Sequence, residues 1–205
     1  AELIRPILRG KDIKRYGYEW ADLWLIATFP SRHYDIDLYP AVKQYLLAFG
    51  IERLEQTGKV HTVNGEQIKS RKKTNNKWFE TQDSISYWED FSKQKIMYSE
   101  IVREPQFYLD NKGEFFAEAT SFIMTGSNLE YLYHLLHSKT ITYFFKTFYA
   151  GGGLGGDGYR YKKVFLEKLP VPKDIININN ENNIEKVVSQ LYKLTEEEIN
   201  YINSL

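Results

Sequence analysis

A glycine-rich run leading into a basic, aromatic segment is the part of this sequence best suited to binding a polyanion. Six glycines fall within residues 151–158, and Arg160, Lys162 and Lys163 follow them. Glycines expose backbone N–H groups and tolerate positive φ, and cationic side chains attract phosphates. The run equally fits a plain flexible loop. Phosphate contact by these three cations is therefore a hypothesis, with a simple loop as the alternative.

Net charge is zero, but the charges are segregated along the chain. Residues 59–77 carry six basic side chains against one acidic, residues 158–173 carry five against one, and residues 174–205 carry six acidic against two basic. Nucleic-acid binding needs local positive potential, so a pI near 7.1 does not exclude it. In the first basic segment the expected phosphate contacts are Lys69, Arg71, Lys72 and Lys73, and an ordinary solvated surface is the alternative.

Motifs for catalysis are incomplete. Residues 151–156 match Gly-x-Gly-x-x-Gly, but they follow an expected helix instead of a strand, and no Gly-Lys-Ser/Thr completes a P-loop. His134 and His137 lie one helical turn apart without an evident third metal ligand. Glu-x-Lys and the Gly-x-Ser-x-Gly elbow are absent from the sequence. We therefore expect no catalytic residue and no metal site in this chain.

Composition indicates a globular protein with a sizeable core. The chain has 205 residues, 42% of them hydrophobic and 16% aromatic, enough to bury a core in one large or two small domains. No apolar run approaches a membrane span, and the N-terminus does not read as a signal peptide. There is no cysteine, so a disulfide framework is excluded. The expected location is the cytoplasm, away from membranes.

The apolar pattern predicts an α+β fold in which helices pack on a mixed or antiparallel sheet. Strands are expected at residues 3–8, 95–102, 107–109 and 114–124, the last three forming an antiparallel unit. Asn64-Gly65 predicts the turn of an exposed hairpin.

Helical periodicity predicts three further features. One helix begins at Pro40, and a long central helix runs from a capping box at Ser127–Glu130 toward Tyr149. An Asn-rich linker then leads to a C-terminal helical tail with a second capping box at Thr195–Glu198. We expect this tail to pack within the chain.

Five segments resemble, in order, one known family. They are Leu3–Tyr16, the positions Tyr39-Pro40, Tyr45-Leu46 and Phe49, then Lys95–Tyr98, Leu135–Lys139 and Leu166–Pro172. Together they are similar to the TaqI-like C-terminal specificity domain, the target recognition domain of type IIG restriction enzymes and related adenine-N6 DNA methyltransferases. One departure is His137, where the family usually has asparagine. The resemblance predicts a DNA target recognition domain at 1–173 and a C-terminal helical extension at 174–205.

The resemblance implies a module that binds double-stranded DNA for an attached methyltransferase and, in type IIG enzymes, a nuclease on the same polypeptide. The sequence has no Pro-Pro and so lacks the Asn/Asp-Pro-Pro-Tyr/Phe motif, which implies that this fragment is not an enzyme by itself. S-adenosylmethionine and Mg are expected only in the attached catalytic domains. Residues able to read bases in the major groove are Arg103, Gln106 and Glu118.

Two other classes of function remain open. The basic segments could serve an acidic partner of a protein-interaction or scaffolding domain, or a small hydrolase could have a scattered active site. Salt-sensitive DNA binding separates recognition from scaffolding. Turnover by the isolated fragment would favour the hydrolase.

Overall fold

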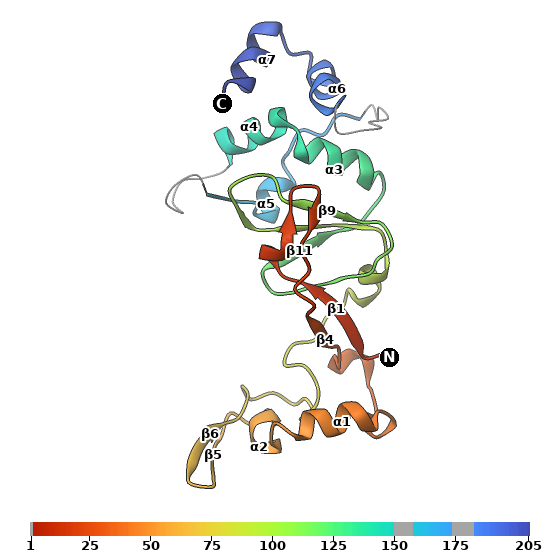
Figure 1. Ribbon diagram of the computed structural model, residues 1–205, viewed down its shortest axis with the longest axis vertical. Coiled ribbons are helices and arrows are strands. Elements are labelled where there is room, and N and C mark those ends of the chain that lie inside the picture. Colours follow the sequence, from red (N-terminus) through yellow and green to blue (C-terminus); the bar gives the residue numbers. More distant parts are fainter. Residues whose placement is uncertain (1, 150–157, 174–182) are drawn as a thin grey trace. The chain divides into compact units, whose positions relative to one another are not determined.

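The computed structural model describes residues 2–149, 158–173 and 183–205, grouped in two compact units (Figure 1). Unit 1 comprises residues 1–5 and 24–88, and unit 2 comprises residues 6–23 and 89–205. The glycine-rich run up to Asp157 and the Asn-rich linker lie outside the described residues, so the hypothesis about the glycines stays open. The expected boundary at residue 173 also stays a prediction.

Unit 1 joins a short helical segment to a β-hairpin. Its elements are β4 (Trp24–Ile26), two 3-10 turns (Pro30–Arg32 and Ile36–Leu38), α1 (Pro40–Leu47), α2 (Ile51–Leu54), β5 (Val60–Val63) and β6 (Glu66–Lys69). Pro40 occupies the first turn of α1, as its lack of an N–H favours. The predicted hairpin is confirmed, because β5 and β6 pair across Asn64 and Gly65, whose φ angles are 51° and 87°.

The main sheet of unit 2 is antiparallel. In it β7 (Lys95–Ser99) lies between β9 (Phe107–Asp110) and β11 (Ser121–Met124), which confirms the predicted three-stranded unit. The strand predicted at 114–124 is interrupted, because the Glu118 carboxylate accepts from the Thr120 N–H at 3.0 Å and turns the chain. Its first part, β10 (Phe116–Ala117), pairs in parallel with β1 (Ile4–Leu8).

Short elements complete the frame of unit 2. They are the pairs β2 (Ile13–Lys14) with β3 (Gly17–Tyr18) and β8 (Ile101–Val102) with β12 (Tyr159–Arg160), the 3-10 turns Gly10–Asp12 and Trp88–Ser92, and α5 (Lys163–Leu166). Parallel and antiparallel pairings occur together with packed helices. The fold is therefore α+β, as predicted.

The expected long central helix is two helices, α3 (Leu129–His137) and α4 (Lys139–Phe148). Ser138 separates them with an extended ψ of 148°. Its hydroxyl donates to the Leu135 carbonyl at 2.8 Å and accepts from the Ile141 N–H at 3.2 Å, so one side chain serves both helix ends. The capping box predicted at Ser127 is also wrong, because the N-cap is Asn128, in the left-handed region and without a side-chain cap.

The C-terminal helices are α6 (Ile184–Leu191) and α7 (Glu196–Asn203). Ile184 and Val188 of α6 are buried in the core cluster that includes Leu135, Ile141 and Phe145. Packing within the chain is thus confirmed for α6. The capping box of α7 is confirmed too: the Thr195 hydroxyl accepts from the Glu198 N–H, and the Glu198 carboxylate accepts from the Thr195 N–H.

An ion pair lies in the interior of unit 2. Lys95 of β7 and Asp110 of β9 are register partners, and both side chains are 0% exposed. The Lys95 Nζ donates to Asp110 Oδ2 at 2.5 Å and to the Phe91 carbonyl at 2.7 Å. Asp110 also accepts from the N–H groups of Glu114 and Phe115, each at 3.0 Å. Burial lowers the pKa of Lys95, while the hydrogen bond to Asp110 opposes that change.

Replacing Gly113 with alanine should destabilise unit 2 by about 2 kcal/mol or more, since φ is +67° and a Cβ would lie 2.4 Å from the Ser92 backbone. Urea unfolding measures the change. Gly17→Ala is the matched control, because a Cβ at Gly17 meets nothing within 4 Å. Equal midpoints for the two variants would contradict the prediction.

Candidate nucleic-acid interface

The first basic segment follows the hairpin of unit 1. Lys69 ends β6, and Lys72 and Lys73 follow after Ser70 and Arg71; all three lysines are exposed. Lys59, at the start of the hairpin, is exposed as well, and its carbonyl accepts from the Ser70 N–H. These lysines present charge to solvent, as a phosphate-binding surface requires. Their contact with phosphate stays a prediction.

Arg71 has a different role from its lysine neighbours. Its guanidinium donates to three backbone carbonyls, those of Leu54 at 2.7 Å, Glu80 at 2.8 Å and Trp78 at 2.5 Å. Burial lowers the pKa of Arg71. Arg71 therefore ties the basic segment to α2 and to the residues around Trp78 and Glu80, and its predicted contact with phosphate stays a prediction.

Gln56 supports the same arrangement. Its amide donates to the Lys77 and Glu80 carbonyls at 3.1 and 2.9 Å, and its carbonyl oxygen accepts from the Thr74 hydroxyl at 2.8 Å. These bonds hold the chain that follows Lys73, and the Arg71 bonds hold the chain before Lys72, without using either lysine. The two lysines are thus presented on a fixed backbone.

The second basic segment lies in unit 2. Arg160 belongs to β12, is half-exposed and has its Nη1 3.5 Å from the Glu100 carboxylate. Lys162 is exposed, and the ammonium of Lys163 lies 3.6 Å from Glu167 in an exposed pair. Such exposed pairs bind weakly and leave the cations available to other anions. The prediction of phosphate contact stays open for all three.

The base-reading candidates have distinct surroundings in unit 2. Arg103 is exposed after β8, and Gln106 is half-buried just before β9. Glu118 is half-buried, and its carboxylate accepts from the Thr120 hydroxyl at 2.6 Å as well as from the Thr120 N–H. Glu118 therefore has a structural role in a turn. Base reading stays a prediction for all three residues.

Aromatic and histidine side chains near these segments form part of the core. Tyr159 and Tyr161 are 3% and 2% exposed, which assigns them to packing and not to the surface. The His137 Nδ1–H donates to the Tyr133 carbonyl at 2.9 Å, and its Nε2 accepts from the Tyr16 N–H at 3.4 Å. Burial lowers the pKa of His137 to about 4, so this ring is neutral.

Four cations that sequence reasoning did not group together line one cavity of about 540 Å³ in unit 2. They are Arg15, Arg103, Lys139 and Lys146. Only Arg103 was a predicted site residue. A partial signal exists, because Lys139 and Lys146 are seven residues apart and therefore share one face of α4. Arg15 and Arg103 are distant in sequence, so only the tertiary structure brings them to α4. We call this the cationic cavity.

The described residues were compared with the requirements of a metal site and of a membrane-spanning helix. Among them, no group of three His, Cys, Asp or Glu side chains could hold a metal ion. None of the described helices is long and apolar enough to cross a membrane.

Comparison with known families gives one match. The family described as the TaqI-like C-terminal specificity domain matches residues 5–171, which include the first basic segment, residues 158–171 of the second and all four cations of the cationic cavity. No curated protein matches the chain.

Proposed function

The chain belongs to the TaqI-like C-terminal specificity domain family, and from this we propose that it recognises a short sequence of double-stranded DNA. The family has a DNA sequence-specificity role in restriction-modification enzymes. The match over residues 5–171 is the observation that carries the proposal. The exposed lysines of unit 1 and the basic segment of unit 2 support it, because such side chains supply the phosphate contacts that position a duplex.

At a finer level, we place the chain in a type IIG restriction endonuclease or adenine-N6 methyltransferase, where it positions an attached catalytic domain on the DNA. The absence of Pro-Pro supports a chain that does not hold the flipped adenine itself. S-adenosylmethionine and Mg would then be bound by the attached methyltransferase and nuclease. Arg103, Gln106 and Glu118 remain the candidates for base reading.

Duplex DNA binding across a salt series tests the proposal. The logarithm of the binding constant should fall linearly with the logarithm of salt concentration. In Lys72→Gln/Lys73→Gln the slope should be shallower by about 2, since each phosphate contact contributes about 0.9. These two lysines are chosen because they are exposed and take no part in the Arg71 and Gln56 hydrogen bonds.

The control removes the same charge elsewhere. Lys186→Gln/Lys193→Gln alters two exposed lysines of unit 2, outside both basic segments, and should leave the slope unchanged. Selection from a randomised duplex pool by the wild-type chain should then enrich one short motif. Absence of duplex binding at low salt, or binding without any enriched motif, would contradict the proposal and favour the protein-interaction alternative.

A further inference from the structure

The cationic cavity concentrates positive charge with little compensation. Four basic side chains line it, and Glu104 is the acidic side chain among its lining residues. Among the described residues, none of the four cations is within ion-pair distance of a carboxylate. Glu104 lines the cavity and Glu185 interacts electrostatically with Lys139 and Arg15, so four cations there face two carboxylates, and this excess of positive charge favours a bound anion.

All four cations are exposed, and they reach the cavity from different parts of unit 2. The Arg15 Nη2 donates to the His137 carbonyl at 3.2 Å, which anchors the guanidinium but leaves other N–H groups for a ligand. The Lys146 ammonium lies 5.0 Å from the centre of the Tyr159 ring. A guanidinium suits the paired oxygens of a phosphate, and an ammonium adds a point charge.

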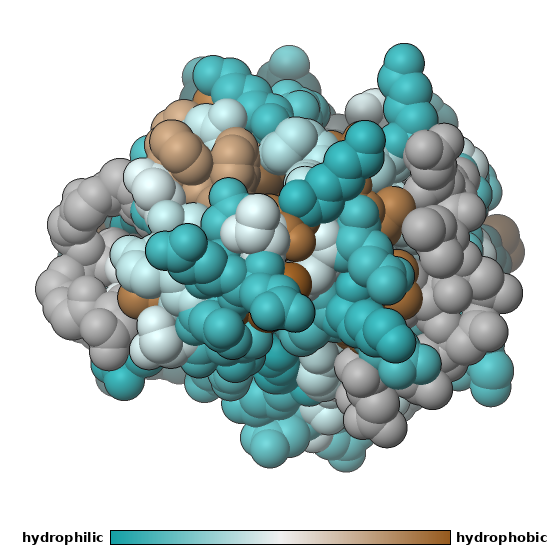
Figure 2. All heavy atoms as spheres, turned by 90° about the horizontal axis from the view of Figure 1, so that it is seen from above, coloured by the Kyte–Doolittle hydropathy of each residue, from teal (hydrophilic) through white to brown (hydrophobic). Residues whose placement is uncertain are grey.

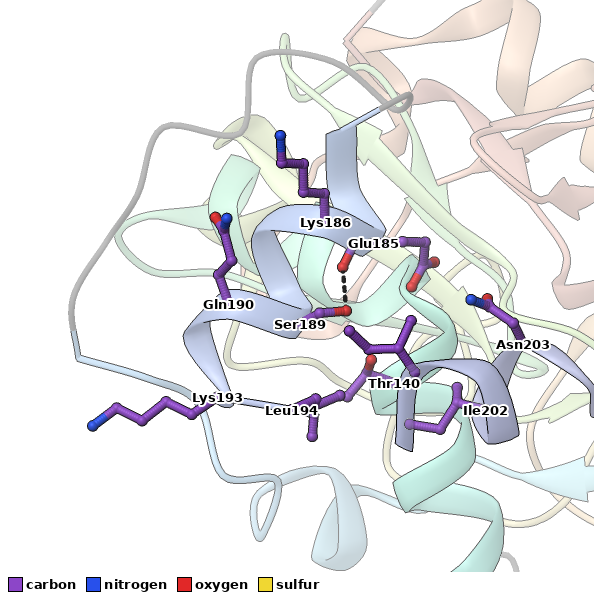
Figure 3. A pocket seen from close by; sticks show the side chains of 10 residues that line it. Thr140, Glu185, Lys186, Ser189, Gln190, Lys193, Leu194, Ile202 and Asn203 are labelled. Atoms are coloured by element: carbon purple, nitrogen blue, oxygen red, sulfur yellow. Dashed lines mark hydrogen bonds between the residues drawn. The ribbon is translucent and has the colours of Figure 1, made fainter. Parts of the chain in front are cut away.

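A neighbouring cavity shows that this charge is local. That cavity has a volume of about 440 Å³, includes Glu185 and lies between α4, α6 and α7 (Figure 3). Figure 3 shows Lys186 and Lys193 extending away from the space between Thr140, Leu194 and Ile202. The Glu185 carboxylate accepts from the Lys139 N–H at 2.8 Å, so it occupies the start of α4. The neighbouring cavity therefore does not concentrate positive charge as the cationic cavity does.

The surface around the C-terminal helices is otherwise mainly hydrophilic. Figure 2 views the end of the chain at which α6 and α7 lie in Figure 1, and it shows hydrophilic side chains over most of the coloured surface, with smaller hydrophobic patches among them. The three glutamates at the start of α7 are not among the residues lining the cationic cavity, which α7 borders through Tyr201 and Ile202. The acidity of the C-terminal segment therefore does not extend into the cavity lining.

The cationic cavity adjoins the segment already expected to contact phosphate. Arg103 directly follows β8, in which Val102 is paired with Tyr159 and Ile101 with Arg160 of β12. Lys146 of α4 reaches the ring of Tyr159 from the helix. The cavity and Arg160 are thus joined by one strand pair and one side-chain contact.

We propose that the cationic cavity binds a phosphate group of the DNA backbone, so that α4 is part of the DNA interface. This inference rests on the proposed function. It gives Arg103 a phosphate contact in place of base reading. The difference is measurable, because losing a phosphate contact weakens binding to all duplex sequences, whereas losing a base contact relaxes specificity at one position.

The test uses the whole chain with Arg103→Gln/Lys146→Gln, which removes two charges but keeps long side chains. Affinity for random duplex DNA is measured across a salt series, beside Lys186→Gln/Lys193→Gln as the control with equal charge. The cavity variant should bind more weakly at low salt, with a slope shallower by about 1 to 2, and the control should match the wild type. Circular dichroism of each variant checks folding.

The outcomes separate this inference from the proposed function. If the wild type binds duplex DNA and only Lys72→Gln/Lys73→Gln lowers the slope, the cavity proposal is overturned and the function stands. If the wild type binds no duplex, both fail. A second experiment adds polyglutamate as a competitor of the bound duplex. If polyglutamate displaces the duplex as well as unlabelled DNA does at the same charge concentration, the cavity binds an acidic protein and the phosphate proposal is overturned.

Discussion

Lys95→Met is expected to destabilise the chain by about 3–5 kcal/mol, because it leaves the buried Asp110 carboxylate without its cation. Two backbone N–H groups still donate to Asp110, but they do not supply a full counter-charge. Asp110→Asn should cost a similar amount by leaving the Lys95 ammonium uncompensated. Equilibrium unfolding in urea measures both changes.

A double-mutant cycle shows whether the pair acts as a unit. Lys95→Met/Asp110→Asn should be less destabilising than the sum of the single changes, because neither charge then remains alone in the interior. Lys93→Met is the matched control, since Lys93 pairs with Asp90 near the surface, where a pair contributes about 1 kcal/mol or less. Equal losses for Lys95→Met and Lys93→Met would show that burial of the pair has no energetic consequence.

Arg71→Ala is expected to destabilise unit 1 by about 3 kcal/mol, because three backbone carbonyls lose a charged donor. The loss should be local to the chain around α2 and the basic segment. Hydrogen exchange of the amides that this region bonds, including the Arg71 N–H to Glu55 and the Thr74 N–H to Gln56, reports it directly.

The neighbouring lysine provides the comparison. Lys72→Ala changes an exposed side chain in the same segment and should alter stability by no more than about 0.5 kcal/mol. Among well-folded chains, DNA affinity should fall more for Lys72→Ala than for Arg71→Ala. The loss of the Lys72 phosphate contact should appear as a shallower dependence of the binding constant on salt. If Arg71→Ala leaves amide exchange as slow as in Lys72→Ala, the structural role given to Arg71 is wrong.

Features that depend on neighbours in sequence were predictable. The turn at Asn64-Gly65 needs only two residues that tolerate positive φ, and the cap at Thr195 needs only Glu198 one helical turn away. The three antiparallel strands of unit 2 follow from apolar alternation and turn residues between them. The family resemblance also rests on local segments, and the match to residues 5–171 confirms it.

Other features depend on contacts between segments that are distant in sequence, and only the tertiary structure decided these. The apolar pattern runs through Ser138, yet the helix stops there because this hydroxyl bonds both to the end of α3 and to the start of α4. Arg71 is a basic residue among lysines in the sequence. Its guanidinium, however, donates to the carbonyls of Leu54 and Trp78, which belong to other segments of unit 1.

Charge placement shows the same division. The sequence determined that the chain has two basic segments, an acidic C-terminal region and the pattern of a DNA specificity domain. It did not determine that Lys95 would be buried against Asp110, or that Arg15 and Arg103 would meet the lysines of α4. The physical reason is that the sequence around a charged residue looks the same whether its side chain lies in solvent, against a buried partner or at a cavity. Only the packing of distant segments decides among these environments.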